Sequence, residues 1–212
     1  MEDRDLLRSP WVVALVVGVV IIAIVWRLWN RSAGFAPPNV ELVTSSAVIL
    51  ALTLGIRWKA AALGPLAVVI ISDLILGNSQ VYLFTWSAWL VIGIFAIVAR
   101  RLIDRHRFLG GVGFALVSST WFFLWTNFGV WALWRGTFYS VDASGLISCY
   151  AAGIPFYRNM LLANLALVPL SALLAGRLMD HRVCRHPHSH IRPHFNSRKQ
   201  PLAHFSLDSG TI

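Results

Sequence analysis

The sequence predicts an all-α integral membrane protein, built as a bundle of six transmembrane helices. Of its 212 residues, 57% are hydrophobic and only 13% are charged, and the mean hydropathy is +0.67. A soluble domain carries about 25% charged residues. The apolar residues also form runs long enough to cross a bilayer core, and none alternates every two residues as a β-barrel strand does. Helices are therefore the structure that satisfies the backbone of these runs in lipid.

Six apolar runs are predicted to be membrane-spanning helices. The first is longer than the core of a signal peptide and has acidic residues before it, so we expect it to be retained as a helix. The third contains Pro65, and the fifth is unusually long and rich in aromatic residues. Together they form one transmembrane domain, residues 1–179, followed by a disordered basic, His-rich cytoplasmic tail, residues 180–212. The predicted helices are residues 11–29, 40–56, 60–76, 81–99, 108–134 and 160–179.

The distribution of Lys and Arg predicts that both termini lie in the cytoplasm. Six helices place the N-terminus, the loops after the second and fourth helices and the tail on one side, which then carries fourteen of the 18 basic residues. The other side carries Arg27, Arg31, Arg135 and Arg158. The positive-inside rule assigns the basic side to the cytoplasm. We therefore expect a multi-pass protein of the cell inner membrane, whose formal charge of +9 reflects topology and not binding to nucleic acid.

Polar side chains within or beside the apolar runs gather at the predicted outer face. Ionisable and amide groups are costly in the membrane and usually face the bundle interior or a cavity. Their position at the outer ends of several helices predicts an outward-facing pocket that binds a substrate. The alternative interpretation is interfacial capping and interhelical hydrogen bonding, with Arg158 either anchoring the interface or pairing with Asp73. The candidate residues are Glu41, Asp73, Asn127, Trp131, Arg158 and Asn159.

The fifth predicted helix is the most informative part of this pattern. Phe123, Asn127, Trp131 and Trp134 follow one another at helical spacing and share one face. An amide among aromatic rings can orient a small ligand, although an aromatic belt at the membrane interface also explains the two tryptophans. We expect Asp73, Asn127, Trp131 and Arg158 to converge near the outer leaflet, between the third, fifth and sixth helices.

Other motifs give weaker signals. Ala14 and Gly18 form a small-xxx-small pair on the first helix, which predicts close approach of a partner membrane protein but also arises by chance. The histidines of the tail either bind a metal or belong to a solvated basic segment. There is no Walker A loop, His-Glu-x-x-His or Gly-x-Ser-x-Gly motif, so we expect no enzyme activity and no cofactor.

Two short motifs resemble a family of uncharacterised bacterial multi-pass membrane proteins. They are Thr-Asn-Phe-Gly-Val-Trp at 126–131 and Gly-Ile-Pro-Phe-Tyr-Arg-Asn at 153–159. The likeness covers roughly residues 37–176. More distantly, the chain is similar to the substrate-binding S components of energy-coupling-factor transporters. That resemblance implies six helices with cytoplasmic termini, an outward site capped by loops and a small-residue face on the first helix. The usual glycine-rich second helix is replaced here by Asn-Val-Glu-Leu-Val-Thr at 39–44.

These features favour one function and leave two others open. The favoured function is a transport or solute-binding component that captures a small molecule from outside and needs a partner for energy. The alternative is a non-catalytic structural or assembly protein of the membrane without a ligand. A membrane enzyme ranks last, because the sequence shows no nucleophile or acid–base set.

Overall fold

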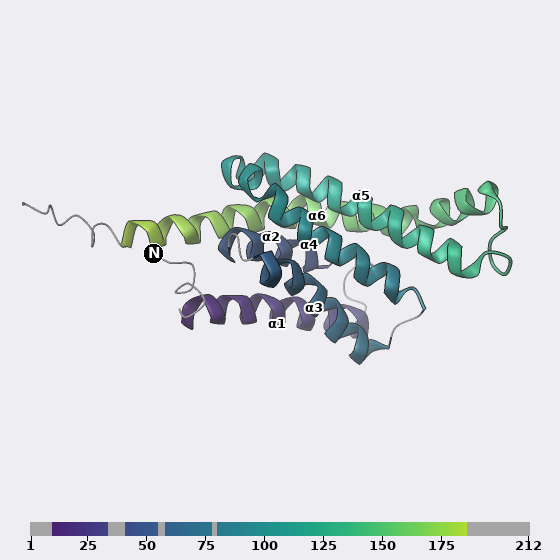
Figure 1. Cartoon of the computed structure of the whole chain (residues 1–212), viewed down its shortest axis with the longest axis horizontal. Coiled ribbons are helices and arrows are strands. Elements are labelled where there is room, and N and C mark those ends of the chain that lie inside the picture. Colours follow the sequence, from purple (N-terminus) through teal and green to yellow (C-terminus); the bar gives the residue numbers. More distant parts are fainter. Residues whose placement is uncertain (1–9, 34–40, 55–57, 78–79, 186–212) are drawn as a thin grey trace, which may run out of the picture.

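The described part of the chain folds into six α-helices that run roughly alongside one another (Figure 1). The structure is a computed structural model and describes residues 10–33, 41–54, 58–77 and 80–185. Within these ranges the predicted all-α class and the number of helices are confirmed. The helices are α1 (Pro10–Ala33), α2 (Val43–Leu54), α3 (Trp58–Leu76), α4 (Tyr82–Arg105), α5 (Arg107–Trp134) and α6 (Ala143–Arg185).

Four of the described helices are long and apolar enough to cross a membrane. The qualifying stretches are Val13–Arg31, Tyr82–Arg105, Arg107–Trp134 and Ala143–Leu178. Two further apolar stretches, Val43–Leu54 and Leu63–Leu76, are shorter. Several apolar helices of this length in one chain indicate a multi-pass membrane protein that lies in the lipid bilayer.

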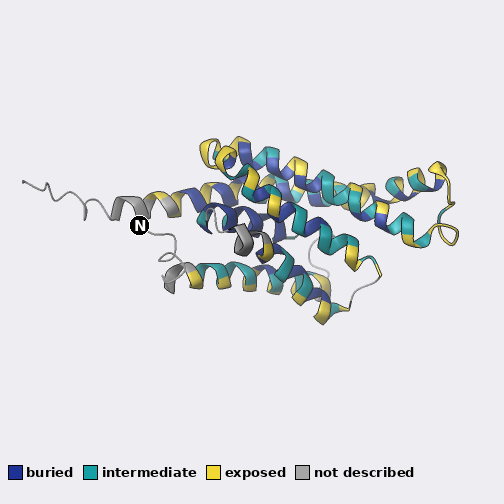
Figure 2. Ribbon diagram, viewed as in Figure 1, coloured by how far each residue is buried: buried dark blue, intermediate teal, exposed yellow. Residues whose placement is uncertain are grey.

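Helix α2 differs from the prediction of a full crossing at residues 40–56. It has 12 residues, which is about 18 Å at the α-helical rise and shorter than a hydrocarbon core of about 30 Å. Most of its residues are buried, and it packs against α3, α4 and α6 (Figure 2). A helix that is apolar on all sides belongs inside a bundle. Because protein surrounds it, its length is not set by the thickness of the lipid.

Helix α6 also differs from the prediction, because it begins at Ala143 and not at residue 160. The predicted long loop is a short turn, residues 135–142, and α5 and α6 extend together beyond the other helices (Figure 1). Gly153 and Pro155 look like turn signals, yet the helix continues through them. Packing against α5 explains this, since a neighbouring helix makes a proline kink tolerable in a membrane.

At its C-terminal end, α6 continues past residue 180, where the tail is predicted to begin, to Arg185. The remainder of the predicted tail, with its possible metal-binding histidines, lies outside the described residues.

Helix α1 is the most exposed part of the bundle, and it packs on α2 and α3 (Figure 2). Ala14 is exposed, and a Cβ atom placed on Gly18 would meet nothing within 4 Å. The small-residue pair on α1 therefore leaves open space at Gly18 and exposed surface at Ala14. Binding of a partner at this face stays a prediction.

Candidate functional site

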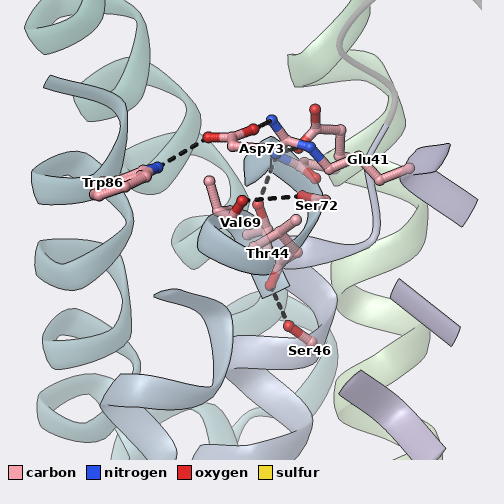
Figure 3. A network of polar contacts seen from close by, with 10 residues as sticks. Glu41, Thr44, Ser46, Val69, Ser72, Asp73 and Trp86 are labelled. Atoms are coloured by element: carbon pink, nitrogen blue, oxygen red, sulfur yellow. Dashed lines mark hydrogen bonds and ion pairs between the residues drawn. The ribbon is translucent and has the colours of Figure 1, made fainter. Parts of the chain in front are cut away.

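Three charged side chains from different parts of the bundle meet in one cluster, which we call the charged cluster: Arg27, Glu41 and Asp73 (Figure 3). The Arg27 guanidinium donates from Nη1 to Glu41 Oε2 at 3.1 Å and from Nη2 to Asp73 Oδ1 at 2.7 Å. Trp86 on α4 donates its indole Nε1 hydrogen to Asp73 Oδ2 at 2.9 Å. The cluster therefore ties together α1, α3, α4 and the residues just before α2.

The charged cluster is largely shielded from the surroundings, and the charges of its three described members do not balance. The side chains of Arg27, Glu41 and Asp73 are 15%, 24% and 5% exposed. Two carboxylates share one guanidinium, so the fully ionised cluster carries one negative charge in excess. Among the described residues, no three His, Cys, Asp or Glu side chains come together as a metal site would require. Within the described residues, the Arg27 guanidinium is the group that pairs with both acids.

A buried amide lies beside this cluster and connects three helices. Asn164 on α6 donates through Nδ2 to Thr44 Oγ1 on α2 at 3.2 Å and to Ser119 Oγ on α5 at 2.9 Å. Asn164 also lines a small cavity of about 20 Å³. A space of that size holds about one water molecule. We call it the small cavity, and its lining residues are Glu41, Trp89, Phe122, Met160 and Asn164.

A larger cavity of about 360 Å³ lies between α4, α5, α6 and the turn that joins α5 to α6, and we call it the outward cavity after the orientation proposed below. Its wall combines phenylalanine rings with amide, hydroxyl and thiol groups, and none of its lining residues is charged. The lining residues are Thr85, Phe122, Phe123, Thr126, Asn127, Val130, Tyr139, Cys149, Ala152, Gly153, Phe156, Tyr157 and Met160.

Hydrogen bonds hold the polar groups of the outward cavity in place. Asn127 donates through Nδ2 to the Phe123 carbonyl at 2.8 Å, and the Cys149 thiol donates to the Asn127 carbonyl at 3.3 Å. A side chain on Gly153 would overlap the Asn127 amide, so glycine at this position of α6 leaves room for that amide. Burial raises the pKa of Tyr139 above its ordinary value, so this residue lines the cavity as a neutral phenol. The cavity thus offers fixed, uncharged hydrogen-bonding groups beside flat rings.

The turn from α5 to α6 forms the outer end of this region. Trp131 donates its indole Nε1 hydrogen to the Ser140 carbonyl at 3.0 Å, and the Arg135 guanidinium lies 5.5 Å from the Trp131 ring centroid. Asp142 accepts hydrogen bonds from Ser140, Ser144 and the Gly145 backbone, which lower its pKa to about 2. At neutral pH it is therefore an anion at the N-terminus of α6, where it satisfies free backbone N–H groups.

The comparisons with known proteins give one match. Residues 7–183 match the sequence model of a family of unknown function, DUF6580. The chain belongs to this family. The match covers α1 to α5 and α6 up to residue 183, so the charged cluster and both of these cavities lie within the DUF6580 region. No curated protein and no solved structure matches the chain.

The expected convergence of Asp73, Asn127, Trp131 and Arg158 does not occur in this DUF6580 protein. Asp73 pairs with Arg27, so the proposed pair with Arg158 is wrong. Of these four residues, only Asn127 lines the outward cavity, which lies between α4, α5 and α6 and not between α3, α5 and α6. Trp131 instead holds the turn.

The sixth helix explains the position of the remaining candidates. Because α6 begins at Ala143, Arg158 and Asn159 lie in the middle of a helix and not at its outer end. Arg158 is exposed, Asn159 is half-buried, and neither lines the outward or the small cavity. Glu41 lies in the charged cluster as well as on the small cavity. A role in substrate binding stays a prediction for all six residues.

Arg27 is the main residue of the site that the sequence analysis missed, because it was counted only as a topology signal. It is an arginine inside an otherwise apolar run, in a chain whose neighbouring runs each contribute one acid at the same level. Charged residues within a membrane tend to pair with one another. That rule would have proposed Arg27 as the partner of Glu41 and Asp73.

Proposed function

We propose that this DUF6580 protein is a membrane solute-binding or transport component that captures a small, uncharged molecule from the outer face. The outward cavity is the observation that carries the proposal. Its volume of about 360 Å³ lies in the range of roughly 300–1,000 Å³ that is usual for ligand sites. Such sites are mostly apolar, with a few polar groups that fix orientation, as in this cavity. Energy for transport would come from a partner protein, because the chain has no nucleotide-binding loop.

The chemistry of the wall defines the class of molecule. Asn127, Thr126, Tyr139 and Tyr157 supply hydrogen-bond donors and acceptors without charge, and Phe122 and its neighbours supply flat apolar surface. A charged solute would lose its hydration without gaining a counter-ion. The cavity therefore favours a flat, neutral molecule with several hydrogen-bonding groups, such as a heterocycle of vitamin size.

The orientation of the protein is part of the proposal. We propose that both termini lie in the cytoplasm of a cell inner membrane, so that the outward cavity opens away from the cytoplasm. Reporter fusions after Gly77 and Gly136 are expected to lie outside, and fusions after Lys59 and Asp104 inside. Alkaline phosphatase and green fluorescent protein activities measure this. Reversed signals at two or more positions would contradict the orientation.

Substitution of Asn127 by alanine is expected to abolish ligand-induced stabilisation while the protein still inserts and folds. Asn127 is the amide in the wall of the outward cavity, and its own hydrogen bond to Phe123 is local to α5. Thermal unfolding in mild detergent against a panel of vitamins and metal ions measures the effect. A ligand at one hundred times its Kd stabilises the folded state by about 2.7 kcal/mol.

The matched control for this experiment is Leu124→Ala, because Leu124 is exposed on the same helix and does not line the cavity. This variant is expected to keep the ligand response. If Asn127→Ala keeps the response too, the cavity is not the binding site. If no compound stabilises the natural protein and no small molecule co-purifies with it, the alternative of a structural or assembly protein without a ligand is favoured.

A further inference from the structure

The two acids of the charged cluster have different surroundings. Both oxygens of Asp73 accept hydrogen bonds, Oδ1 from Arg27 at 2.7 Å and Oδ2 from Trp86 at 2.9 Å. Glu41 has its ion pair with Arg27 through Oε2, at the longer distance of 3.1 Å, and its side chain lines the small cavity. Asp73 is thus the acid whose two oxygens are both engaged, and Glu41 is the acid that faces an open space.

The small cavity presents an unused hydrogen-bond donor beside Glu41. Trp89, on its wall, is only 1% exposed, and its indole Nε1 is buried without a hydrogen-bond partner among the described residues. A buried donor of this kind is costly unless a water or an acceptor meets it. The cavity has room for about one water molecule. Such a water would accept from Trp89 and donate to Glu41.

The small cavity adjoins the outward cavity. Phe122 of α5 and Met160 of α6 line both of them. Only these two side chains are shared, and both are apolar and without charge. A path for water from the outward cavity to Glu41 would therefore pass these two side chains.

We propose that Glu41 is a proton-binding site whose occupancy is coupled to the outward cavity. The water of the small cavity gives one proton to the Glu41 carboxylate and regains one from a water in the outward cavity. The hydroxide left in the outward cavity is neutralised by a proton from bulk water, so the net step is the uptake of one proton by one carboxylate. Protonation converts the carboxylate into a neutral carboxylic acid, and the excess negative charge of the cluster disappears. The proton site stands by itself, whereas its coupling to a solute rests on the proposed function.

The groups that surround Glu41 support a proton as the ligand. Arg27 faces it from α1 and Asp73 lies across that guanidinium on α3. The walls contributed by α4, α5 and α6 are Trp89, Phe122, Met160 and Asn164, none of which is charged. No second cation among the described residues therefore balances the second acid. Neutralisation by a proton meets this imbalance in a membrane, where unpaired charge is costly.

Infrared spectroscopy of the full chain in lipid vesicles tests the proposal without any solute. A protonated carboxyl gives a carbonyl stretch that a carboxylate lacks. We expect this band in the natural protein at neutral pH, and we expect its loss in Glu41→Gln. Asp104→Asn is the matched control, since Asp104 is an exposed acid outside the cluster and its replacement leaves the band unchanged.

A second variant keeps the test decisive if Glu41→Gln does not fold. Asp73→Asn leaves Arg27 and Glu41 as a balanced ion pair, so the midpoint at which the band is lost moves toward acid, by about one pH unit or more. A band that persists in Glu41→Gln, or a midpoint that Asp73→Asn does not move, overturns the proposal. A band that disappears when Na⁺ replaces choline at constant pH also overturns it in favour of a metal cation.

The same measurement separates this inference from the proposed function. Asn127→Ala removes one amide from the wall of the outward cavity and leaves the charged cluster intact. The infrared band of this variant is therefore expected to equal that of the natural protein. If the natural protein shows the band and no solute stabilises it, the proton site is supported and the proposed binding of a solute is contradicted. A pH-independent solute affinity, together with a normal band, would contradict the coupling.

Discussion

Replacement of Arg27 by glutamine is expected to lower the free energy of unfolding by about 3–5 kcal/mol, the usual result of removing one partner from a buried ion pair. Arg27 is the one cation between Glu41 and Asp73 among the described residues, and its loss leaves two acids facing each other in a membrane bundle. Reversible unfolding in mixed micelles measures the change.

Two further variants isolate the effect of the ion pairs. Arg31→Gln lies one turn further along α1 at an exposed position, and its effect is expected to stay within about 0.5 kcal/mol. The double variant Arg27→Gln/Asp73→Asn removes one charge of each sign and is expected to recover part of the loss. Equal effects of Arg27→Gln and Arg31→Gln would mean that the charged cluster contributes nothing to stability.

Replacement of Gly111 by alanine is expected to destabilise the protein by about 1–3 kcal/mol, as overpacking does in a tight core. A Cβ atom on Gly111 would lie 2.7 Å from the Cα atom of Pro169, so the backbones of α5 and α6 would have to separate. Neither backbone can yield as a flexible side chain would. Thermal unfolding in the same detergent measures the loss.

Gly113 gives an unusually close control, because it lies on the same helix and a Cβ atom there would meet nothing within 4 Å. Gly113→Ala is expected to be neutral or to stabilise the protein by up to about 1 kcal/mol, since alanine is the better helix former. The two variants make the same chemical change in the same helix. If they shift stability equally, close packing of α5 on α6 is not what Gly111 provides.

The fold class could be predicted because long apolar runs form helices in lipid, and such runs are visible in the sequence. The length of α2 could not, because an apolar run in lipid and an apolar run inside a bundle have the same composition. The start of α6 was also missed. Gly153 and Pro155 are local turn signals, and the contact of Gly153 with Asn127 on α5, which overrides them, joins residues far apart in the sequence.

The candidate site was predicted in part for the same reason. Glu41, Asp73 and Asn127 were chosen because a polar group in an apolar run must find a partner or a cavity, and each of them has one. Which partner each finds depends on how the helices are arranged. Arg27 and Arg158 are equally good partners by composition, and only the packing of α1 on α3 selects Arg27.

The length of α6 has a mechanical consequence. Its 43 residues span roughly 65 Å. The helix approaches the α5 backbone closely at Pro169 and is tied to α5 near its own C-terminal end by the two hydrogen bonds from Arg107 to Asp180. Pro169 divides α6 into a longer arm, which carries the wall of the outward cavity, and a shorter arm, which carries Asp180. A change in the width of the cavity that tilted α6 as a whole would therefore also displace the Arg107–Asp180 contact at the opposite end of the helix.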